Sequence, residues 1–381
     1  MRWYLFISFS LPFALIHAQT QVIADLESDT PYPNAQSHIT EQECSTVDLT
    51  KESGPVRLQV GGTCYAYTAM ELLNFNEEKK YSAIHLASLH QDRSEKPNEV
   101  GVSKLIGFSG GSVANTLINA YQNGVCPDEL ITSIDAEKVN TKSYEKIMNL
   151  FESSKKIDLT KQCIQDVFSM PNPLEMILQI ARNVEVEKAK KDKHRILVLV
   201  QKSFPSFPLT EFENIFNESR DVATFFNALI INSCKNNLIK INTKKVKFTY
   251  LSTYIDKKTN KKIIYDESRE KMFKEMNEKL QNHNPVGISY YSYGLIYTRK
   301  SEEHSAHASL VVGRMWQEAT KDFSGRVKER AGCYYLVKNS WGKDWSPPYG
   351  SKARSVAGMP GYYMLSEKNF KEHVYGITTL E

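Results

Sequence analysis

Three residues that lie far apart in the chain, Cys64, His307 and Asn339, are of the types that thiol-based nucleophilic catalysis requires. A thiol is a weak nucleophile until it ionises, and a helix N-terminus or a neighbouring imidazolium favours the thiolate. Cys64 follows the turn at 61–63 and opens an apolar stretch, so the sequence predicts that it begins a helix whose dipole favours the thiolate. Taken alone, this feature fits a buried structural cysteine equally well.

His307 and Asn339 each have two interpretations. His307 begins the apolar run HASLVVG, where a histidine can face a cleft from a sheet edge or be a hydrogen-bonded core residue. His304 completes an H-x-x-H pair, but no acidic or cysteine ligands follow at the spacing of zinc sites, so we predict no metal. Asn339 can hold an imidazole through a hydrogen bond that Trp341 shields, although asparagine is also a common turn residue.

The elements that must position these residues can be predicted from hydrophobic periodicity. Helical patterns begin at Cys64, surround residues 83–89, fill 113–123 after the loop GFSGGS (107–112), and recur around Met272–Leu280. Strand patterns cover 285–291, 307–313, 333–341 and 361–365 in the C-terminal third, and 196–200 and 248–255 in the Lys- and Asn-rich middle.

Composition excludes several classes of protein. The 381 residues are 41% hydrophobic and 24% charged, which is typical of a globular protein and argues against disorder or a fibrous fold. The net charge of +4 is small and the basic runs 185–195 and 235–247 are interleaved with acidic or apolar residues, so we predict no nucleic-acid binding. Six cysteines are too few for a disulfide scaffold.

The first 18 residues have the pattern of a secretory signal peptide. Arg2 precedes a short apolar stretch, which ends at the small-residue cleavage pattern Ile16-His17-Ala18. A membrane anchor is the alternative, but the stretch is shorter than the ~20 residues that span a bilayer. We therefore expect an exported protein, secreted or periplasmic, with no transmembrane segment. All six cysteines lie beyond residue 18, where disulfides can persist, and their pairing stays open.

The order and contexts of these motifs resemble the papain-like cysteine proteases over most of residues 45–135 and 266–365. The stretches that carry the resemblance, in chain order, are GTCYAYTA, GFSGGS, NPVGISYYSYG, HASLVVG, YYLVKNSWGKDW and GYYML. The resemblance implies a two-lobed α+β fold with a helical left lobe and a β-barrel-like right lobe. The active-site cleft would lie between the lobes.

The resemblance also implies roles for individual residues. Cys64 would attack the scissile carbonyl, His307 would exchange protons with the sulfur and the leaving amine, and Asn339 would orient His307. The backbone N–H of Cys64 and the side chain of Gln59 would stabilise the oxyanion. No cofactor is implied.

Substrate contacts follow from the same likeness. Gly110 and Gly111 would lie along an extended peptide substrate, and Trp341 would cover the His–Asn bond and border the leaving group.

The sequence departs from the family in three places. Gln59 lies five residues before Cys64 instead of six, Tyr65 replaces a tryptophan, and both cysteines of the family's main disulfide are absent.

The spacing of the motifs predicts the domain organisation. His307 lies 243 residues after Cys64, against roughly 130–150 in papain-like enzymes, an excess of about 100 residues. We predict a signal peptide at 1–18, an N-terminal extension at 19–44, a helical lobe with the nucleophile at 45–135, an inserted α/β segment at 136–265 and a β-rich lobe with His307 and Asn339 at 266–381.

The sequence thus predicts a thiol peptidase that acts on peptide or protein substrates. Two alternatives stay open: a catalytically silent binding protein of the same fold, and a transpeptidase or amidase that shares the thioester step. The segment before Cys44 is short for an inhibitory pro-domain, so latency would depend on residues 19–43, the insertion or a separate proteinaceous inhibitor.

Overall fold

The computed structural model describes residues 40–59, 62–89, 110–131, 146–154, 191–256, 261–296, 306–348 and 351–381, with gaps of one to five residues inside several of these ranges. The predicted signal peptide, residues 107–109 of the glycine-rich loop, Cys163 and His304 lie outside the described residues.

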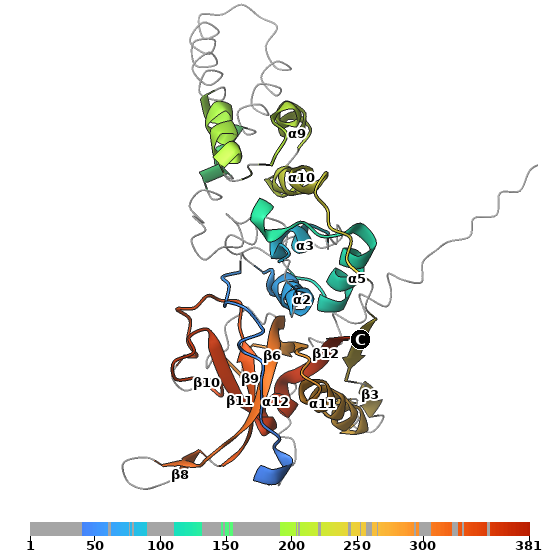
Figure 1. The fold of residues 1–381 in the computed structure, drawn as a ribbon, viewed down its shortest axis with the longest axis vertical. Coiled ribbons are helices and arrows are strands. Elements are labelled where there is room, and N and C mark those ends of the chain that lie inside the picture. Colours follow the sequence, from blue (N-terminus) through green and yellow to red (C-terminus); the bar gives the residue numbers. More distant parts are fainter. Residues whose placement is uncertain are drawn as a thin grey trace, which may run out of the picture.

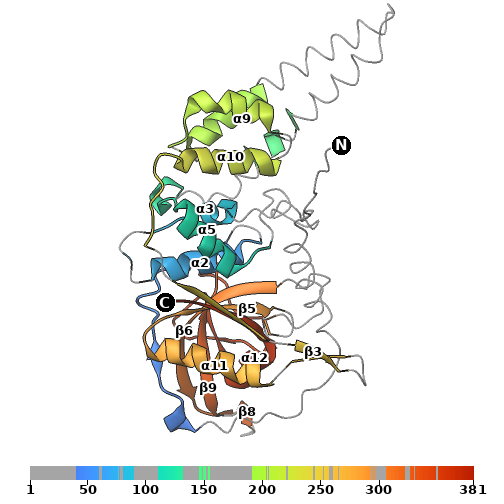
Figure 2. The ribbon, with the colours of Figure 1, turned by 90° about the vertical axis from the view of Figure 1, so that its right-hand side faces the viewer.

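The described elements stack in three layers, as Figures 1 and 2 show from two sides. A sheet forms one end together with two helices, a helical layer lies in the middle, and further helices form the other end. The helical layer consists of α2 (Cys64–Asn74), α3 (Ala83–Leu89) and α5 (Val113–Asn123); the far end carries α9 (Phe212–Glu218) and α10 (Val222–Cys234); the sheet is accompanied by α11 (Asp266–Gln281) and α12 (Glu367–His373).

The main sheet is antiparallel, with the strand order β10-β11-β9-β6-β5-β12-β2 and the short β1 paired to β6. The predicted α+β class is confirmed, and the predicted strands at 285–291, 307–313, 333–341 and 361–365 correspond to β5, β6, β9 and β11. The strands of this sheet are β1 (Val47–Asp48), β2 (Val246–Tyr250), β5 (Val286–Tyr291), β6 (Ala306–Gln317), β9 (Gly332–Lys338), β10 (Arg354–Ser355), β11 (Tyr362–Ser366) and β12 (Val374–Leu380).

Short strands and 3-10 turns accompany the longer elements. Among the described residues, two antiparallel strand pairs lie outside the main sheet, and three 3-10 turns precede or connect longer elements. The pairs are β3 (Thr253–Asp256) with β4 (Lys261–Ile264) and β7 (Thr320–Lys321) with β8 (Val327–Glu329); the turns are η2 (Glu41–Glu43), η3 (Asp128–Leu130) and η4 (Leu209–Glu211).

The predicted strand at 196–200 is wrong, because residues 191–202 are helical. Asp192, Ile196 and Val200 are buried at four-residue spacing, whereas Val198 is 49% exposed, which is the pattern of one helix face. A short run of consecutive apolar residues does not distinguish a buried strand from a helix. The predicted strand at 248–255 is divided between β2 and β3.

The middle of the chain is joined to the rest at several places, two of which are a disulfide and a strand pairing. A disulfide links Cys126, just after α5, to Cys234 at the end of α10. Further along, β2 pairs with β12 and becomes the edge strand of the main sheet. The region predicted as an insertion is therefore tied to both the helical layer and the sheet.

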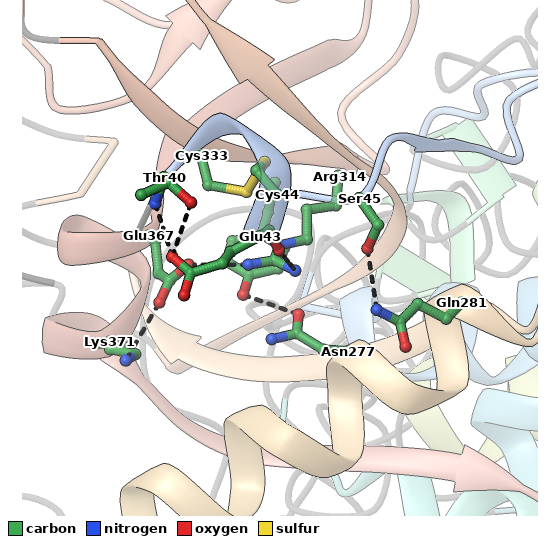
Figure 3. Close-up of a disulfide and its surroundings, with 11 residues drawn as sticks. Thr40, Glu43, Cys44, Ser45, Asn277, Gln281, Arg314, Cys333, Glu367 and Lys371 are labelled. Atoms are coloured by element: carbon green, nitrogen blue, oxygen red, sulfur yellow. Dashed lines mark hydrogen bonds and ion pairs between the residues drawn. A yellow bond between two sulfur atoms is a disulfide. The ribbon is translucent and has the colours of Figure 1, made fainter. Parts of the chain in front are cut away.

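A second disulfide joins Cys44 to Cys333 of β9 and holds the first described residues against the sheet (Figure 3). Beside it, Arg314 of β6 forms an ion pair with Glu367 at 3.3 Å and donates to the carbonyl of Glu43. The two cysteines are 289 residues apart in the sequence, so the disulfide closes a long loop and removes much conformational freedom from the unfolded chain. Of the cysteines in the described residues, only Cys64 is free.

Candidate functional site

Cys64 is the first residue of α2, as predicted, and its side chain is buried. Every residue of α2 is buried because the helix lies between the main sheet and the other helices of its layer. The backbone N–H groups of Cys64, Tyr65 and Ala308 are hydrogen-bonded to the thiol and lower its pKa. Burial has the larger opposite effect and raises the pKa of Cys64 to about 11. The expected advantage of the helix N-terminus is therefore outweighed by desolvation in the resting protein.

His307 lies near the start of β6 and is 5% exposed. Its Nε2 donates to Oδ1 of Asn339 at 3.0 Å, which leaves Nδ1 as the basic nitrogen of the neutral ring. Burial lowers the pKa of His307 to about 4, and the bond to Asn339 opposes this effect. The Cys64 thiol contacts the backbone N–H of Ala308, the residue that follows His307 on β6.

Asn339 is fixed from several directions directly after β9. Its backbone N–H donates to the carbonyl of Gly361, and its Oδ1 also accepts from the N–H of Ser340 at 2.8 Å. The amide oxygen that holds His307 is thus positioned by its own loop. Asn339 is 2% exposed, so this arrangement is shielded from water.

Aromatic rings surround the His307–Asn339 pair. Trp341 stacks on His307, with ring centroids 4.4 Å apart, and Trp345 packs edge-on against Trp341. Tyr290 of β5 meets His307 edge-on at 5.4 Å. The stacking of Trp341 on His307 helps to explain why the imidazole is desolvated.

A hydroxyl network that sequence reasoning missed lies behind the histidine. The hydroxyl of Tyr290 is hydrogen-bonded to Ser309 at 3.0 Å and to Tyr363 at 2.7 Å. These residues come from β5, β6 and β11. The first two strands are neighbours in the sheet, whereas β9 lies between β6 and β11. Strand register brings them together, and no sequence motif records that register. Their positions inside predicted strands were the only available signal.

Gln59 lies beside the loop that carries Asn339. Its backbone N–H donates to the carbonyl of Ser340, and its Oε1 accepts from the Ser340 hydroxyl at 2.6 Å. The preceding residue, Leu58, forms a bridge with Trp341. The structure therefore brings Gln59 to the Asn339–Trp341 segment, with its amide oxygen directed at Ser340.

The glycine-rich loop lies next to the turn that precedes the nucleophile. The N–H of Gly110 donates to the carbonyl of Gly62 at 3.3 Å, and Gly110 has a φ of 84°, which favours glycine. Gly110 and Gly111 are both exposed. Ser112 then caps α5 by accepting from the N–H of Asn115.

A buried ion pair that the sequence did not reveal joins the helical layer to the asparagine segment. Lys338, the residue before Asn339, contacts Glu71 of α2 at 2.8 Å and donates to the carbonyl oxygens of Ser53 and Gly54. Burial raises the pKa of Glu71 and lowers that of Lys338, while each charge opposes the shift of the other. The pair ties the helix of Cys64 to the strand that ends at Asn339.

The described residues contain no group of three potential metal ligands and no helix long and apolar enough to cross a bilayer. Of the residues singled out in the sequence, Cys64, His307, Asn339 and Trp341 are connected by direct contacts or through Ala308. Gln59 and Gly110 border this group through Ser340 and Gly62.

Comparison with known proteins gives structural likenesses without sequence matches. No family model and no curated protein match the chain. Solved structures that resemble it include PepW from Lactobacillus rhamnosis HN001, with 13% identity and a TM-score of 0.39 over 97% of this chain and 89% of PepW.

Two cysteine proteases resemble it at a similar level. The proform of Amb a 11, a ragweed pollen allergen, has 12% identity and a TM-score of 0.34 over 91% of this chain and 66% of that one. The protease and lectin-like domains of Cwp84 from Clostridium difficile have 13% identity and a TM-score of 0.35 over 98% of this chain and 59% of that one. These values are too low to establish a shared activity.

Proposed function

We propose that this chain is an exported papain-like thiol peptidase that hydrolyses peptide bonds through Cys64, His307 and Asn339. The observation that carries the proposal is the His307–Asn339 hydrogen bond beneath Trp341, next to a strand residue whose N–H contacts the Cys64 sulfur. A nucleophile, a base and a group that orients the base thus come together from three separate segments. This is the arrangement that the sequence resemblance implies.

In the proposed reaction, Nδ1 of His307 accepts the proton of the Cys64 thiol as the sulfur bonds to the scissile carbonyl carbon. The C–N bond then breaks, and the imidazolium gives its proton to the leaving amine, which departs and leaves a thioester. His307 next deprotonates a water molecule that attacks the thioester. The C–S bond breaks, the carboxylic product leaves, and the proton returns to the sulfur.

The pKa directions bear on the resting state of the pair. Because burial opposes a lone thiolate and a lone imidazolium alike, the two charges form together by proton transfer. The three N–H groups at the sulfur then favour the ionised pair. Asn339 favours the imidazolium through its amide oxygen.

The proposal also assigns the residues that would stabilise the oxyanion and contact the substrate. The N–H of Cys64 and the amide of Gln59 would stabilise the oxyanion, and the bond from Ser340 to Oε1 would fix the orientation of that amide. Gly110 and Gly111 would lie along the substrate because exposed glycines permit close backbone contact. Trp341 would border the leaving group.

The proposal includes a two-lobed fold with the substrate between a helical lobe (45–135) and a β-rich lobe (266–381). It also includes a signal peptide at 1–18, which would export the protein as a secreted or periplasmic enzyme. A proteinaceous inhibitor is one means of keeping it latent. Its substrates would be peptides or proteins.

A catalytically silent binding protein is the second candidate. The observation that favours it is the burial that raises the pKa of Cys64 to about 11. A silent protein would need neither a reactive sulfur nor a base beside it. The retained hydrogen bond between His307 and Asn339 favours the enzyme.

The test is labelling of the purified, folded protein with an irreversible thiol-reactive peptide probe, read by intact mass. We expect one adduct in the parent and in a Cys163→Ser control, and none in Cys64→Ala. A folded parent that takes up no probe, with residues before Cys44 removed or retained, would reject the enzyme in favour of the binding protein. Product masses with and without added amines then distinguish hydrolysis from transpeptidation.

A further inference from the structure

The stretch 239–242, between α10 and β2, belongs to the region predicted as an insertion and lies against the helical layer. Ile239 and Val125 exchange two backbone hydrogen bonds of 2.9 Å, just after the end of α5. A few residues further on, Lys245 and Glu381 exchange backbone hydrogen bonds of 3.0 and 2.9 Å. In Figures 1 and 2 the chain from α10 therefore descends along the helical layer and ends beside the C-terminus.

A cavity of about 220 Å³ lies between this stretch, the last turn of α2, α5 and the end of β12. Four aliphatic side chains form its apolar lining: Leu73, Ile239, Ile241 and Leu380. Leu73 is buried, and the other three are half-buried. Two of the four come from 239–242, so the region predicted as an insertion supplies one wall of the cavity, and the helical layer and the sheet supply the others.

This cavity is distinct from the candidate functional site. Cys64 is the first residue of α2, whereas Leu73 lies in the last turn of the same helix, about 13 Å further along its axis. The described residues that line the cavity include neither Cys64 nor His307 nor Asn339. A ligand bound in the cavity would therefore occupy the opposite end of the helix from the sulfur.

One acidic and one basic residue stand beside the apolar lining, and both are exposed: Glu77 and Lys240. Burial and the nearby Glu77 carboxylate raise the pKa of Tyr81, which also lines the cavity. The Nζ of Lys240 donates to the carbonyl of Gln122 at 3.2 Å, which holds the ammonium group at the C-terminal end of α5. An ammonium group has three donors, and this bond uses one of them. The cavity thus combines an apolar interior with one negative and one positive group.

We propose that this cavity binds a free apolar amino acid of the size of leucine. Its ammonium group pairs with Glu77, its carboxylate pairs with Lys240, and its side chain lies among the four aliphatic residues. A cavity of about 150 Å³ holds a benzene ring, so a cavity of about 220 Å³ has room for an apolar side chain and the two charged groups of one amino acid. The inference is independent of the proposed peptidase function, because binding requires no cleavage.

The test is isothermal titration calorimetry of the purified full chain with L-leucine and three analogues that each lack one group. 3-Methylbutylamine lacks the carboxylate, 4-methylpentanoate lacks the ammonium group, and glycine lacks the apolar side chain. We expect L-leucine to bind with a Kd below about 1 mM. Each analogue should bind at least about tenfold more weakly, because it loses either a charge-assisted hydrogen bond or the apolar contact.

Two variants assign the charged groups of the ligand to residues. Glu77→Gln should weaken L-leucine binding by about tenfold and leave 4-methylpentanoate binding unchanged, because that analogue has no ammonium group. Lys240→Met should weaken L-leucine binding by a similar factor and leave 3-methylbutylamine binding unchanged. Lys235→Met is the matched control, because it removes another exposed lysine of the same region that does not line the cavity, and it should bind L-leucine like the parent.

A third variant tests the place of binding. Ile241→Trp puts a larger side chain into the cavity and should abolish L-leucine binding, with circular dichroism confirming the fold. A parent that does not bind L-leucine, or that binds 3-methylbutylamine or 4-methylpentanoate as tightly, would overturn the proposal. Unchanged binding in folded Ile241→Trp would overturn it as well, since the ligand would lie elsewhere. A protein that binds L-leucine but takes up no thiol-reactive probe at Cys64 would reject the peptidase function alone.

Discussion

The two sides of the candidate site are built in different ways. On the nucleophile side, backbone N–H groups from the first residues of α2 and from Ala308 surround the Cys64 sulfur. On the base side, side chains do the positioning: the Asn339 amide binds His307, and Trp341 and Tyr290 pack against its ring. A backbone site depends little on side-chain identity, whereas a side-chain site depends on each partner.

The difference teaches where the site is sensitive to substitution. Substitutions around Cys64 leave its N–H donors in place as long as α2 and β6 form, but substitutions around His307 remove its partners one by one. The two sides are tied together by the ion pair between Glu71 on α2 and Lys338 next to Asn339.

The largest effect tests whether the two sides act as one unit. Under the proposed function, Cys64→Ala and His307→Ala should each lower kcat/KM by at least about 10⁴-fold, and the double variant should lose little more. Steady-state hydrolysis of a fluorogenic peptide gives these values, with exposed His283→Asn as the control that retains activity. Additive losses would show that sulfur and imidazole act independently.

The second largest effect is expected for the ion pair between Lys338 and Glu71, which joins the two sides of the site. Lys338→Met leaves the Glu71 carboxylate buried without its partner, so the free energy of unfolding should fall by about 3–5 kcal/mol. Urea unfolding measures this loss, and the double variant with Glu71→Leu should recover most of it because no lone charge remains. If the single variant is as stable as the parent, the pair does not hold the two sides together.

Asn339→Ala isolates the side-chain positioning of the base. The Nε2 of His307 loses its acceptor, so its tautomer and ring orientation are no longer fixed, and we expect kcat/KM to fall by about 10²-fold. KM should change little, because Asn339 acts through the histidine and not on the substrate. Asn339→Gln can restore an amide acceptor and serves as the rescue variant; a loss confined to KM would contradict the positioning role.

The smallest effect concerns the aromatic cover and the pH profile. His307 has its pKa lowered to about 4, so below that pH the imidazole is already protonated and cannot accept the thiol proton. The acid limb of kcat/KM should therefore lie near pH 4. Trp341→Leu admits water, returns the pKa towards its ordinary value and should move this limb upward by about one pH unit. Trp316→Leu, at the far end of β6, is the control, and an unmoved limb in Trp341→Leu would show that the indole does not desolvate His307.

Much of the fold was predictable because the local signals were strong. Periodic apolar residues predicted α2, α5 and α11, and alternating or β-branched runs predicted β5, β6, β9 and β11. The prediction of a strand at 196–200 was wrong. All five residues are apolar, so their pattern has no helical period, and only their burial in the folded chain shows which face of the helix points inward. Short elements such as β1 and β10 have too few residues for a periodic pattern.

The site was predictable where a motif keeps a residue in its local context, and not where it depends on register. Cys64, His307, Asn339 and Trp341 were proposed as site residues because each lies in a recognisable stretch. Tyr290, Tyr363 and Lys338 gave no such signal, because their roles arise from pairing between strands or from contact with α2.

Local sequence patterns were enough to predict several helices and strands of the described residues and to propose Cys64, His307 and Asn339 as site residues. Local patterns did not reveal that β2 joins the main sheet, that Cys44 pairs with Cys333 and Cys126 with Cys234, or that burial opposes a lone charge on Cys64 or His307. The physical reason is that periodicity and local motifs depend on neighbours in sequence. Strand register, disulfide pairing and desolvation depend on residues that become neighbours only when the chain has folded.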